Sequence, residues 1–393
     1  MIQEVFKKNK IELVCFFFIA FAFVFKISLA TPFILFLLLL NISGAKDFKD
    51  NFAVKLLSLL FGSIYILYLL SFFLNYDFSS KLIIRSLGFI FIPLLFLVKR
   101  ISEKEIKFFI FSFLILQLIH TLYINCIVLQ YHFFSASKSF ENFTALVENK
   151  FLIERPYFSL NCLLSIFCVK FLLDRATVKK GILYLFIGLM IFTLFIIAAR
   201  LAMGVSVLIC LFIFLKERKI AYFAGFLCIL VVTVLTNKYA IQRLAIEKGE
   251  PRIAIWTCAK NIIDEQEFNY FIGTFSSEKV DKKLIECYNS KEISSGPYWW
   301  IGKYNYQYNT HNQYLWFFVC YGLLGLILFL GIFGVHFWNF IKNKNAYSFF
   351  FILIFSFQSL FENLLSRQLG IYLFIWFCFL FVFPIENTIQ DEE

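Results

Sequence analysis

The sequence predicts an all-α polytopic membrane protein with about twelve transmembrane helices and one large loop lobe on the outer face of the membrane. Hydrophobic residues make up 61% of the 393 positions, and the mean hydropathy is +0.78, whereas a soluble domain is about half apolar. Apolar runs of membrane-spanning length recur along the chain. Lys and Arg gather in alternate connections between these runs, which is the topology signal of a multi-pass membrane protein.

The apolar runs define the predicted spans. A transmembrane helix needs about 20 predominantly apolar residues, and twelve segments approach or meet that length, although the second and the eighth are short. They lie at 11–27, 30–44, 54–74, 82–98, 106–131, 157–173, 181–198, 201–215, 219–236, 312–335, 347–362 and 368–384.

The beginning of the chain has features of a secretory signal. Lys7, Lys8 and Lys10 precede the first apolar run, and the sequence up to Ala30 resembles a cleavage site. Further apolar segments follow at once, so we expect an uncleaved first span rather than a removed signal.

The basic residues set the predicted orientation. With the amino terminus inside, the inner connections hold eighteen Lys and Arg residues, and the short outer turns hold little beyond four. The inner set is Lys7, Lys8, Lys10, Lys46, Lys49, Lys55, Lys99, Arg100, Lys104, Lys107, Arg175, Lys179, Lys180, Lys216, Arg218, Lys219, Lys342 and Lys344, and the outer set is Lys26, Lys81, Arg200 and Arg367. Both termini are therefore expected in the cytoplasm. The net charge of +11 is spread over these short loops, so no nucleic-acid partner is expected.

This topology divides the chain into 1–236 with nine spans, a solvated outer lobe at 237–311, and 312–393 with three spans and a cytoplasmic tail. A second outer segment, 132–156, carries apolar residues at helical spacing and is expected to lie in the interface. Cys258 and Cys287 share the lobe. In an oxidising compartment they could form a disulfide, and spacing alone leaves this open. The cysteines show no metal-ligand spacing.

The histidines are few, and one of them has a distinctive setting. His120, His132 and His336 lie in or at the ends of spans, where packing residues are the usual interpretation. His311 stands where the lobe re-enters the membrane. The positive end of a helix dipole disfavours the protonated ring there, which leaves the neutral imidazole that a general base needs.

The sequence after His311 continues with Asn312, nine residues, and Gly322-x-x-Gly325. The alternative to a catalytic motif is an interfacial His followed by glycines that allow close helix packing. The residues alone leave both interpretations open.

Arginines collect on the predicted outer face. Arg200 ends a short turn between two apolar runs, where the alternative to anion binding is snorkelling to the headgroups. Arg252 and Trp256 are four apart and would share a helix face, which joins a phosphate-binding fork to an aromatic platform for sugar rings. The alternative is a plain amphipathic helix. Arg155 and Arg367 lie on the same side of the membrane.

These residues resemble the signature of a known family, the O-antigen ligase and O-antigen polymerase superfamily of bacterial lipid-linked-glycan transferases. The resemblance rests on the His311-Asn312 and Gly322-x-x-Gly325 signature and on the order of four further segments over residues 150–385. These are Pro156-Tyr157-Phe158-Ser159, Ala199-Arg200-Leu201-Ala202, Arg252-x-x-x-Trp256 and the late outer turn from Glu362 to Gly370. The chain departs from the family pattern in having Ala199 before Arg200 and a single Gly273 after the lobe helix.

The resemblance implies an inverting glycosyltransferase in the bacterial inner membrane. It would move a glycan from a polyprenyl diphosphate, such as undecaprenyl diphosphate, to an acceptor hydroxyl on a lipid or glycan at the periplasmic face. His311 would remove the acceptor proton, and Arg200 and Arg252 would hold the diphosphate without a metal or other cofactor. Trp256, Asn312, Arg155 and Arg367 would contact substrate.

Two alternatives to a ligase stay open, namely a polymerase of the same superfamily and a transporter. The acceptor could be lipid A–core, as in lipopolysaccharide biosynthesis by a ligase, or a second lipid-linked repeat, as in a polysaccharide polymerase. From another class, the chain could be a transporter of lipid-linked glycan. A transporter is expected to show broken helices and matching halves, and the sequence shows no clear internal repeat.

Overall fold

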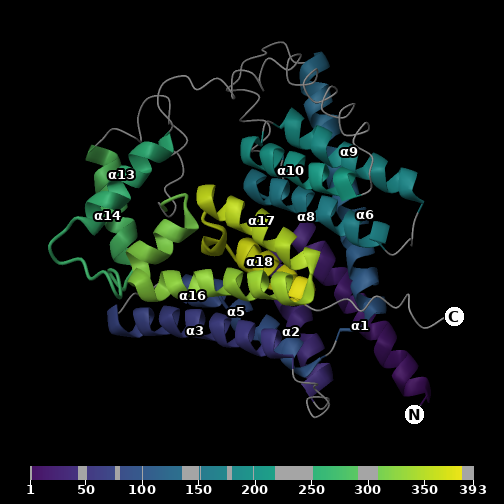
Figure 1. Ribbon diagram of the computed structural model, residues 1–393, viewed down its shortest axis with the longest axis horizontal. Coiled ribbons are helices and arrows are strands. Elements are labelled where there is room, and N and C mark those ends of the chain that lie inside the picture. The colour runs from purple at the N-terminus through teal and green to yellow at the C-terminus, as the bar shows by residue number, and fades with distance from the viewer. Residues whose placement is uncertain are drawn as a thin grey trace. The chain divides into compact units, whose positions relative to one another are not determined.

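The computed structural model describes residues 2–42, 51–75, 80–99, 101–134, 150, 152–174, 179–197, 199–216, 251–290 and 309–382. These residues are organised as helices, with one isolated bridge between Asn269 and Gly273 and no named strand among them (Figure 1). The predicted interfacial segment at 132–156, the ninth span and the carboxy-terminal tail lie wholly or mostly outside the described residues.

The chain forms two compact units, each built from two separate stretches of sequence. Unit 1 comprises Met1–Leu37 and Ile101–Gly249, and unit 2 comprises Leu38–Arg100 and Glu250–Glu393. The sequence-based division at residues 236 and 311 follows the expected side of the membrane rather than packing, and it stays a prediction.

Unit 1 is organised around one helix that is buried on all sides. Every residue of α8 (Arg155–Asp174) from Tyr157 to Leu173 is buried, as expected of a helix that carries apolar residues on every face. It contacts α6 (Glu103–Phe134), α9 (Lys180–Ile196) and α10 (Arg200–Lys216), and α6 also packs on α1 (Ile2–Val24). Short η1 (Ile27–Leu29) and α2 (Ala30–Asn41) follow α1 in the chain.

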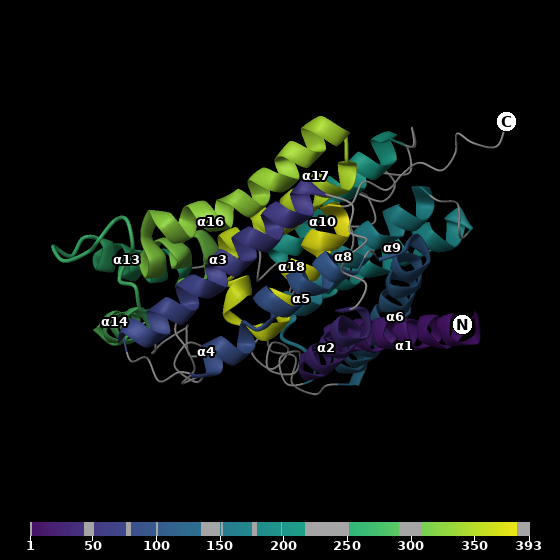
Figure 2. The ribbon, with the colours of Figure 1, turned by 90° about the horizontal axis from the view of Figure 1, so that it is seen from below.

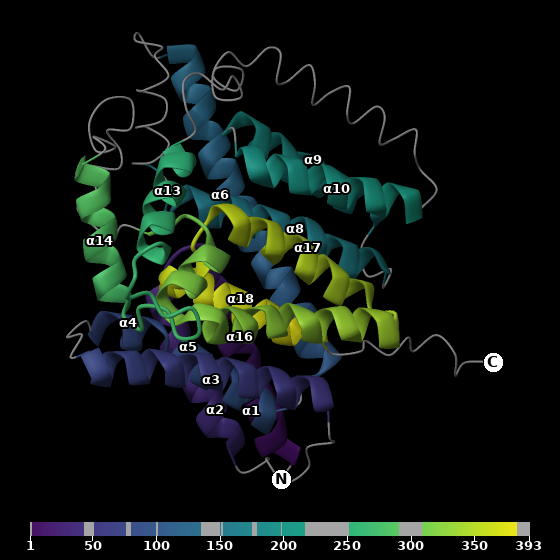
Figure 3. The same cartoon turned by 60° about the vertical axis from the view of Figure 1, so that its left-hand side comes forward.

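Unit 2 has a similar plan around α18 (Gln368–Val382), which is buried from Leu369 to Val382. It contacts α3 (Phe52–Asn75), α5 (Gly88–Val98), α17 (Ala346–Phe361) and η4 (Leu364–Ser366). The 31-residue α16 (Gln313–Asn343) runs beside α3 in both Figure 2 and Figure 3. Short α4 (Ser80–Arg85) precedes α5.

The described part of the predicted lobe is a pair of helices at the beginning of α16. α13 (Pro251–Ile263) and α14 (Ser277–Ser290) contact each other, and both contact α16 (Figure 1). α14 buries Val280, Leu284 and Tyr288, which recur every four residues along one face, and its other faces are polar.

The helices agree with the predicted membrane class. Except for 219–236, each predicted span overlaps a helix or, at 82–98, the broken pair α4 and α5. Four helices are long and apolar enough to cross a membrane, at Phe52–Leu74, Glu103–Tyr131, Arg155–Asp174 and Gln313–Asn343, and six more apolar helices are shorter. A helical membrane-embedded protein is thus supported, while the number twelve stays a prediction.

A loop of the lobe is inserted into a break in α16. Gly322 has non-helical backbone angles (φ 61°, ψ −156°), so the helix is interrupted there. The amides of Leu323 and Leu324, which lose their helical acceptors, donate to the carbonyl oxygens of Tyr270 and Phe271 at 2.9 and 3.1 Å. Gly322 therefore allows the helix to be interrupted, and carbonyl groups of the lobe accept the hydrogen bonds of the freed amides. At this position the glycine does not mediate close packing of two helices.

Replacement of Gly322 by alanine is expected to destabilise the protein strongly. An added Cβ would lie 2.4 Å from the carbonyl carbon and oxygen of Phe271, and a side chain at this positive φ is strained in any case. The two effects together should cost about 2–4 kcal/mol, measured as a lower melting temperature in detergent. The matched control is Gly334→Ala in the same helix, where a Cβ meets nothing within 4 Å. Equal melting temperatures for the two variants would contradict the break.

Candidate functional site

The residues before α16 hold His311 in an unusual backbone conformation. His311 has φ 45°, in the left-handed region that non-glycine residues seldom occupy. Its amide donates to Asn309 Oδ1 at 2.9 Å. The next residue, Asn312, is the N-cap of α16, and its side chain accepts from the amide of Leu315 at 2.9 Å. His311 is therefore fixed on one side by a turn and on the other by a helix start.

A second segment, after α17, ties this turn down. Asn363 Oδ1 accepts from the amide of Asn312 at 2.9 Å and from Thr310 Oγ1 at 3.3 Å. Gln313 Oε1 accepts from the amide of Leu365 at 2.7 Å. Thr310, Gln313 and Asn363 are all buried. Buried hydrogen bonds of this kind define a single geometry, because breaking them would leave polar groups without partners.

Glu362 lies between His311 and Arg252. One of its carboxylate oxygens is 3.5 Å from His311 Nδ1, and the other is 3.6 Å from a terminal nitrogen of Arg252. Between 22% and 30% of each of these three side chains stays exposed, so a ligand can reach them. The guanidinium of Arg252 also lies over the ring of Phe361, 5.5 Å from its centroid.

This arrangement suits proton removal. A carboxylate facing Nδ1 favours the tautomer with the proton on that nitrogen, which leaves the lone pair of Nε2 as the proton acceptor. The same carboxylate stabilises the imidazolium that forms when the proton is taken up. A guanidinium has five donors, so Arg252 has capacity to contact both Glu362 and an anionic ligand.

Trp256 has a structural contact as well as an open face. Its Nε1 donates to the carbonyl oxygen of Thr310 at 3.0 Å, and its ring lies 6.4 Å from that of Phe361. Trp256 also lines a shallow pocket of about 350 Å³ beside the start of α16. The other lining residues are Asn312, Tyr314, Leu315, Phe318 and Leu326. The lining is mainly aromatic and apolar, and Asn312 adds a polar side chain to it.

The structure brings four of the predicted site residues together, namely His311, Arg252, Trp256 and Asn312. Arg367 is in the same connection as Glu362, half-buried between η4 and α18. Arg155 and Arg200 belong to unit 1, where they begin α8 and α10. Arg200 is exposed and Arg155 is half-buried. Their assignment to substrate stays a prediction from the sequence.

The two other histidines with described side chains are packing residues. His120 lies against the rings of Phe25 and Phe158, with centroids 5.5 and 4.8 Å away. His336 stacks on Phe351 at 4.1 Å, and its Nε2 is 3.0 Å from Cys378 Sγ. The side chain of His132 lies outside the described residues.

Glu362 and Asn363 are the site residues that sequence reasoning missed. The family resemblance covers the late turn that carries them, but within that turn it points only to Arg367 as a substrate contact. The signal that could have found Glu362 is its place at the end of an apolar span, where an ionised side chain is costly and is often functional. Glu362 lies 51 residues from His311 in the chain, so its partner could not be deduced from spacing.

The fold and the site define a helical membrane-embedded protein with a carboxylate-supported histidine beside an arginine. Comparison of the chain with models of known protein families, with characterised proteins and with solved structures finds no match. The function is therefore argued from the site itself and from the order of the motifs.

Proposed function

We propose that the protein is a membrane glycosyltransferase that moves a glycan from a polyprenyl diphosphate to an acceptor hydroxyl on the periplasmic face, most simply as a ligase with lipid A–core as acceptor. The observation that supports this best is Glu362, whose two oxygens lie within 3.6 Å of His311 and Arg252. A base and an anion-binding group are thereby held side by side, as a displacement with a diphosphate leaving group requires.

In the proposed reaction the acceptor oxygen attacks the anomeric carbon of the first sugar in one displacement. His311 Nε2 takes the hydroxyl proton while the bond from the acceptor oxygen to that carbon forms. The bond from the carbon to the diphosphate oxygen breaks on the opposite face, and the leaving diphosphate keeps the electron pair. Arg252 stabilises the charge that develops on this oxygen. The configuration at the carbon inverts.

The experiment is turnover by purified protein with a polyprenyl-diphosphate oligosaccharide and an acceptor, followed as release of polyprenyl diphosphate. Glycan profiles of a deletion strain separate the two enzyme types. Loss of all long glycan from lipid A with lipid-linked chains accumulating means ligase. Lipid A capped with a single repeat means polymerase. Absence of any transfer with a panel of donors would argue against the class.

The broken helix α16 brings the transporter alternative into consideration, because discontinuous helices are typical of transporter substrate sites. In such sites the freed backbone groups bind the substrate. Here Tyr270 and Phe271 already accept from the freed amides of Leu323 and Leu324, which favours an architectural role for the break. Proteoliposomes loaded with labelled lipid-linked glycan test this alternative, since a transporter would move the lipid across the bilayer without hydrolysis or transfer.

The proposed location can be tested by labelling. Ser290 is at the exposed end of α14, and a Ser290→Cys variant is expected to react with a membrane-impermeant maleimide in intact spheroplasts. A cysteine in place of exposed Lys344, on the predicted inner side, should react only after permeabilisation. Because Cys126 is exposed, both variants are made on a Cys126→Ser background. Labelling of position 290 only after permeabilisation would exclude a periplasmic site.

A further inference from the structure

We propose that Tyr288 and the Cys258–Cys287 disulfide form a brace that positions His311, so that Tyr288 is a positioning residue for the proton transfer. The proposal rests on the proposed function for its catalytic meaning, but the brace itself is defined by contacts that do not depend on activity. It connects α14, the second helix of the lobe, to the turn that carries His311.

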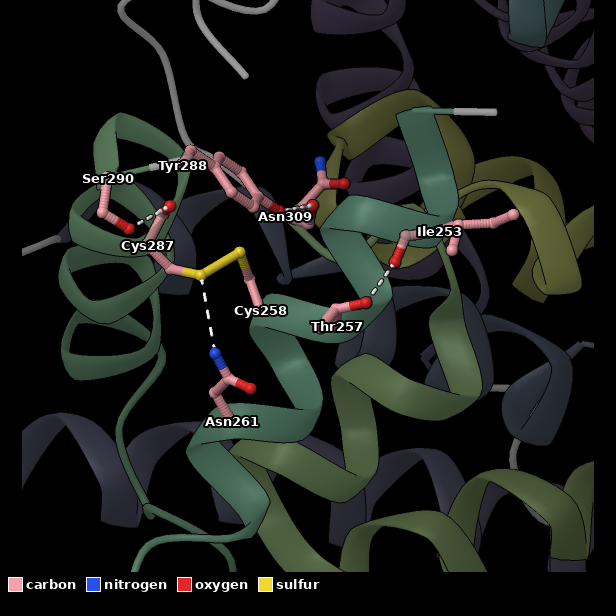
Figure 4. Close-up of a disulfide and its surroundings, with 8 residues drawn as sticks. All are labelled: Ile253, Thr257, Cys258, Asn261, Cys287, Tyr288, Ser290 and Asn309. Atoms are coloured by element: carbon pink, nitrogen blue, oxygen red, sulfur yellow. Dashed lines mark hydrogen bonds between the residues drawn. A yellow bond between two sulfur atoms is a disulfide. The ribbon is translucent and has the colours of Figure 1, made fainter. Parts of the chain in front are cut away.

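The brace begins at the disulfide. Cys258 in α13 and Cys287 in α14 are joined by a bond between their sulfur atoms, with Cα atoms 5.7 Å apart (Figure 4). The two helices also pack against each other, and Asn261 of α13 donates to Cys287 Sγ at 3.9 Å (Figure 4), but the disulfide is the covalent link that fixes α14 against α13. Sequence spacing leaves this pairing open, and the structure shows it.

Tyr288 transmits this link to the turn before α16. The residue next to Cys287 is Tyr288, whose side chain is 1% exposed and whose hydroxyl donates to the carbonyl oxygen of Asn309 at 3.1 Å (Figure 4). The side chain of the same Asn309 accepts from the amide of His311 at 2.9 Å. Asn309 is therefore held by α14 on one side and holds His311 on the other.

The two helices act on neighbouring carbonyl groups. Trp256 of α13 donates to the carbonyl oxygen of Thr310, and Tyr288 of α14 donates to that of Asn309. The disulfide cross-links the two helices from which these donors come. A backbone at φ 45° is sparsely populated by histidine and persists only where the surroundings over-determine it. The hydrogen bonds of the brace are part of what holds His311 in this conformation.

Loss of the brace should lower the rate of the chemical step more than donor binding. A base that is displaced from its working geometry loses rate, because proton transfer requires hydrogen-bond distance to the acceptor hydroxyl. For Tyr288→Phe, which removes one hydroxyl and keeps the ring, we expect kcat to fall about 3- to 10-fold, the usual worth of a single neutral hydrogen bond. The donor KM should be unchanged, because Arg252 is not touched.

The experiment combines activity with hydrogen–deuterium exchange of the peptide that covers residues 309–315, on the full chain in lipid nanodiscs. Four samples are compared: the parent, Tyr288→Phe, the parent reduced with dithiothreitol, and reduced Tyr288→Phe. In the reduction the thiol reagent closes to its own cyclic disulfide and passes two electrons and two protons to the two sulfurs. Tyr270→Phe, an exposed tyrosine of the same lobe, and Cys126→Ser are the matched controls.

The brace predicts faster exchange at 309–315 and a lower kcat in both the Tyr288 variant and the reduced parent, with no further fall when the two changes are combined, because they interrupt one path. Unchanged exchange overturns the brace, whatever the activity. Faster exchange with unchanged kcat, while His311→Ala is inactive, overturns the positioning role and leaves the proposed function intact. Full activity of His311→Ala overturns both. If Tyr288→Phe does not fold, reduction of the folded parent gives the same readouts.

Discussion

Replacement of His311 by alanine is expected to lower turnover by about 10²–10⁴-fold, the usual contribution of positioned acid–base catalysis. The donor KM should change little, because the anion-binding groups stay in place. The measurement is kcat and KM on purified protein with the polyprenyl-linked donor, at equal amounts of folded protein.

A second substitution separates catalysis from folding at the same position. His311 has a positive φ, which glycine adopts without strain, so His311→Gly should be as stable as the parent and as inactive as the alanine variant. The control is Asn345→Ala, which removes the N-cap of α17. It should cost about 1 kcal/mol of stability while turnover per folded molecule is retained. If both His311 variants keep full turnover per folded molecule, the residue is structural.

Much of the fold could be predicted because the membrane makes the helical signal strong. Apolar runs such as 54–74 and 312–335 have few alternatives to a helix in lipid, since every backbone group must be satisfied within the segment. The interruption of α16 at Gly322 could not be predicted in this way. Its cause is a partner, residues 269–275, whose approach depends on tertiary structure and leaves no periodic signal.

The candidate site was predictable in its base and its arginine but not in its organisation. His311 stands out in the sequence because it lies where the lobe re-enters the membrane, and Arg252 stands out because it is four residues from Trp256. The carboxylate of Glu362, the anchor Asn363 and the pairing of Cys258 with Cys287 each depend on a contact between residues far apart in the chain. Spacing carries no information about such contacts.

For Arg252 we expect that alanine lowers turnover by about 10²–10³-fold, as removal of a group that stabilises developing negative charge does in other enzymes. Lysine should restore only part of the loss. Its ammonium is a compact point charge, whereas the guanidinium can lie over Phe361 and face Glu362 while it presents a fork of donors to a diphosphate.

The matched control for this prediction is Lys260→Ala, which removes a cation from the last turn of the same helix at an exposed position. Turnover of this variant should equal that of the parent, because salt screens the effect of an exposed charge on a distant ligand at working ionic strength. Arg200→Ala is measured in the same assay to test the sequence-based assignment in unit 1. Full turnover in Arg252→Ala at saturating donor, with normal protein amount, would remove Arg252 from the leaving-group role. A lysine variant as active as the parent would mean that a positive charge alone is needed. The two-donor geometry of the guanidinium and its alignment by Glu362 would then not contribute to catalysis.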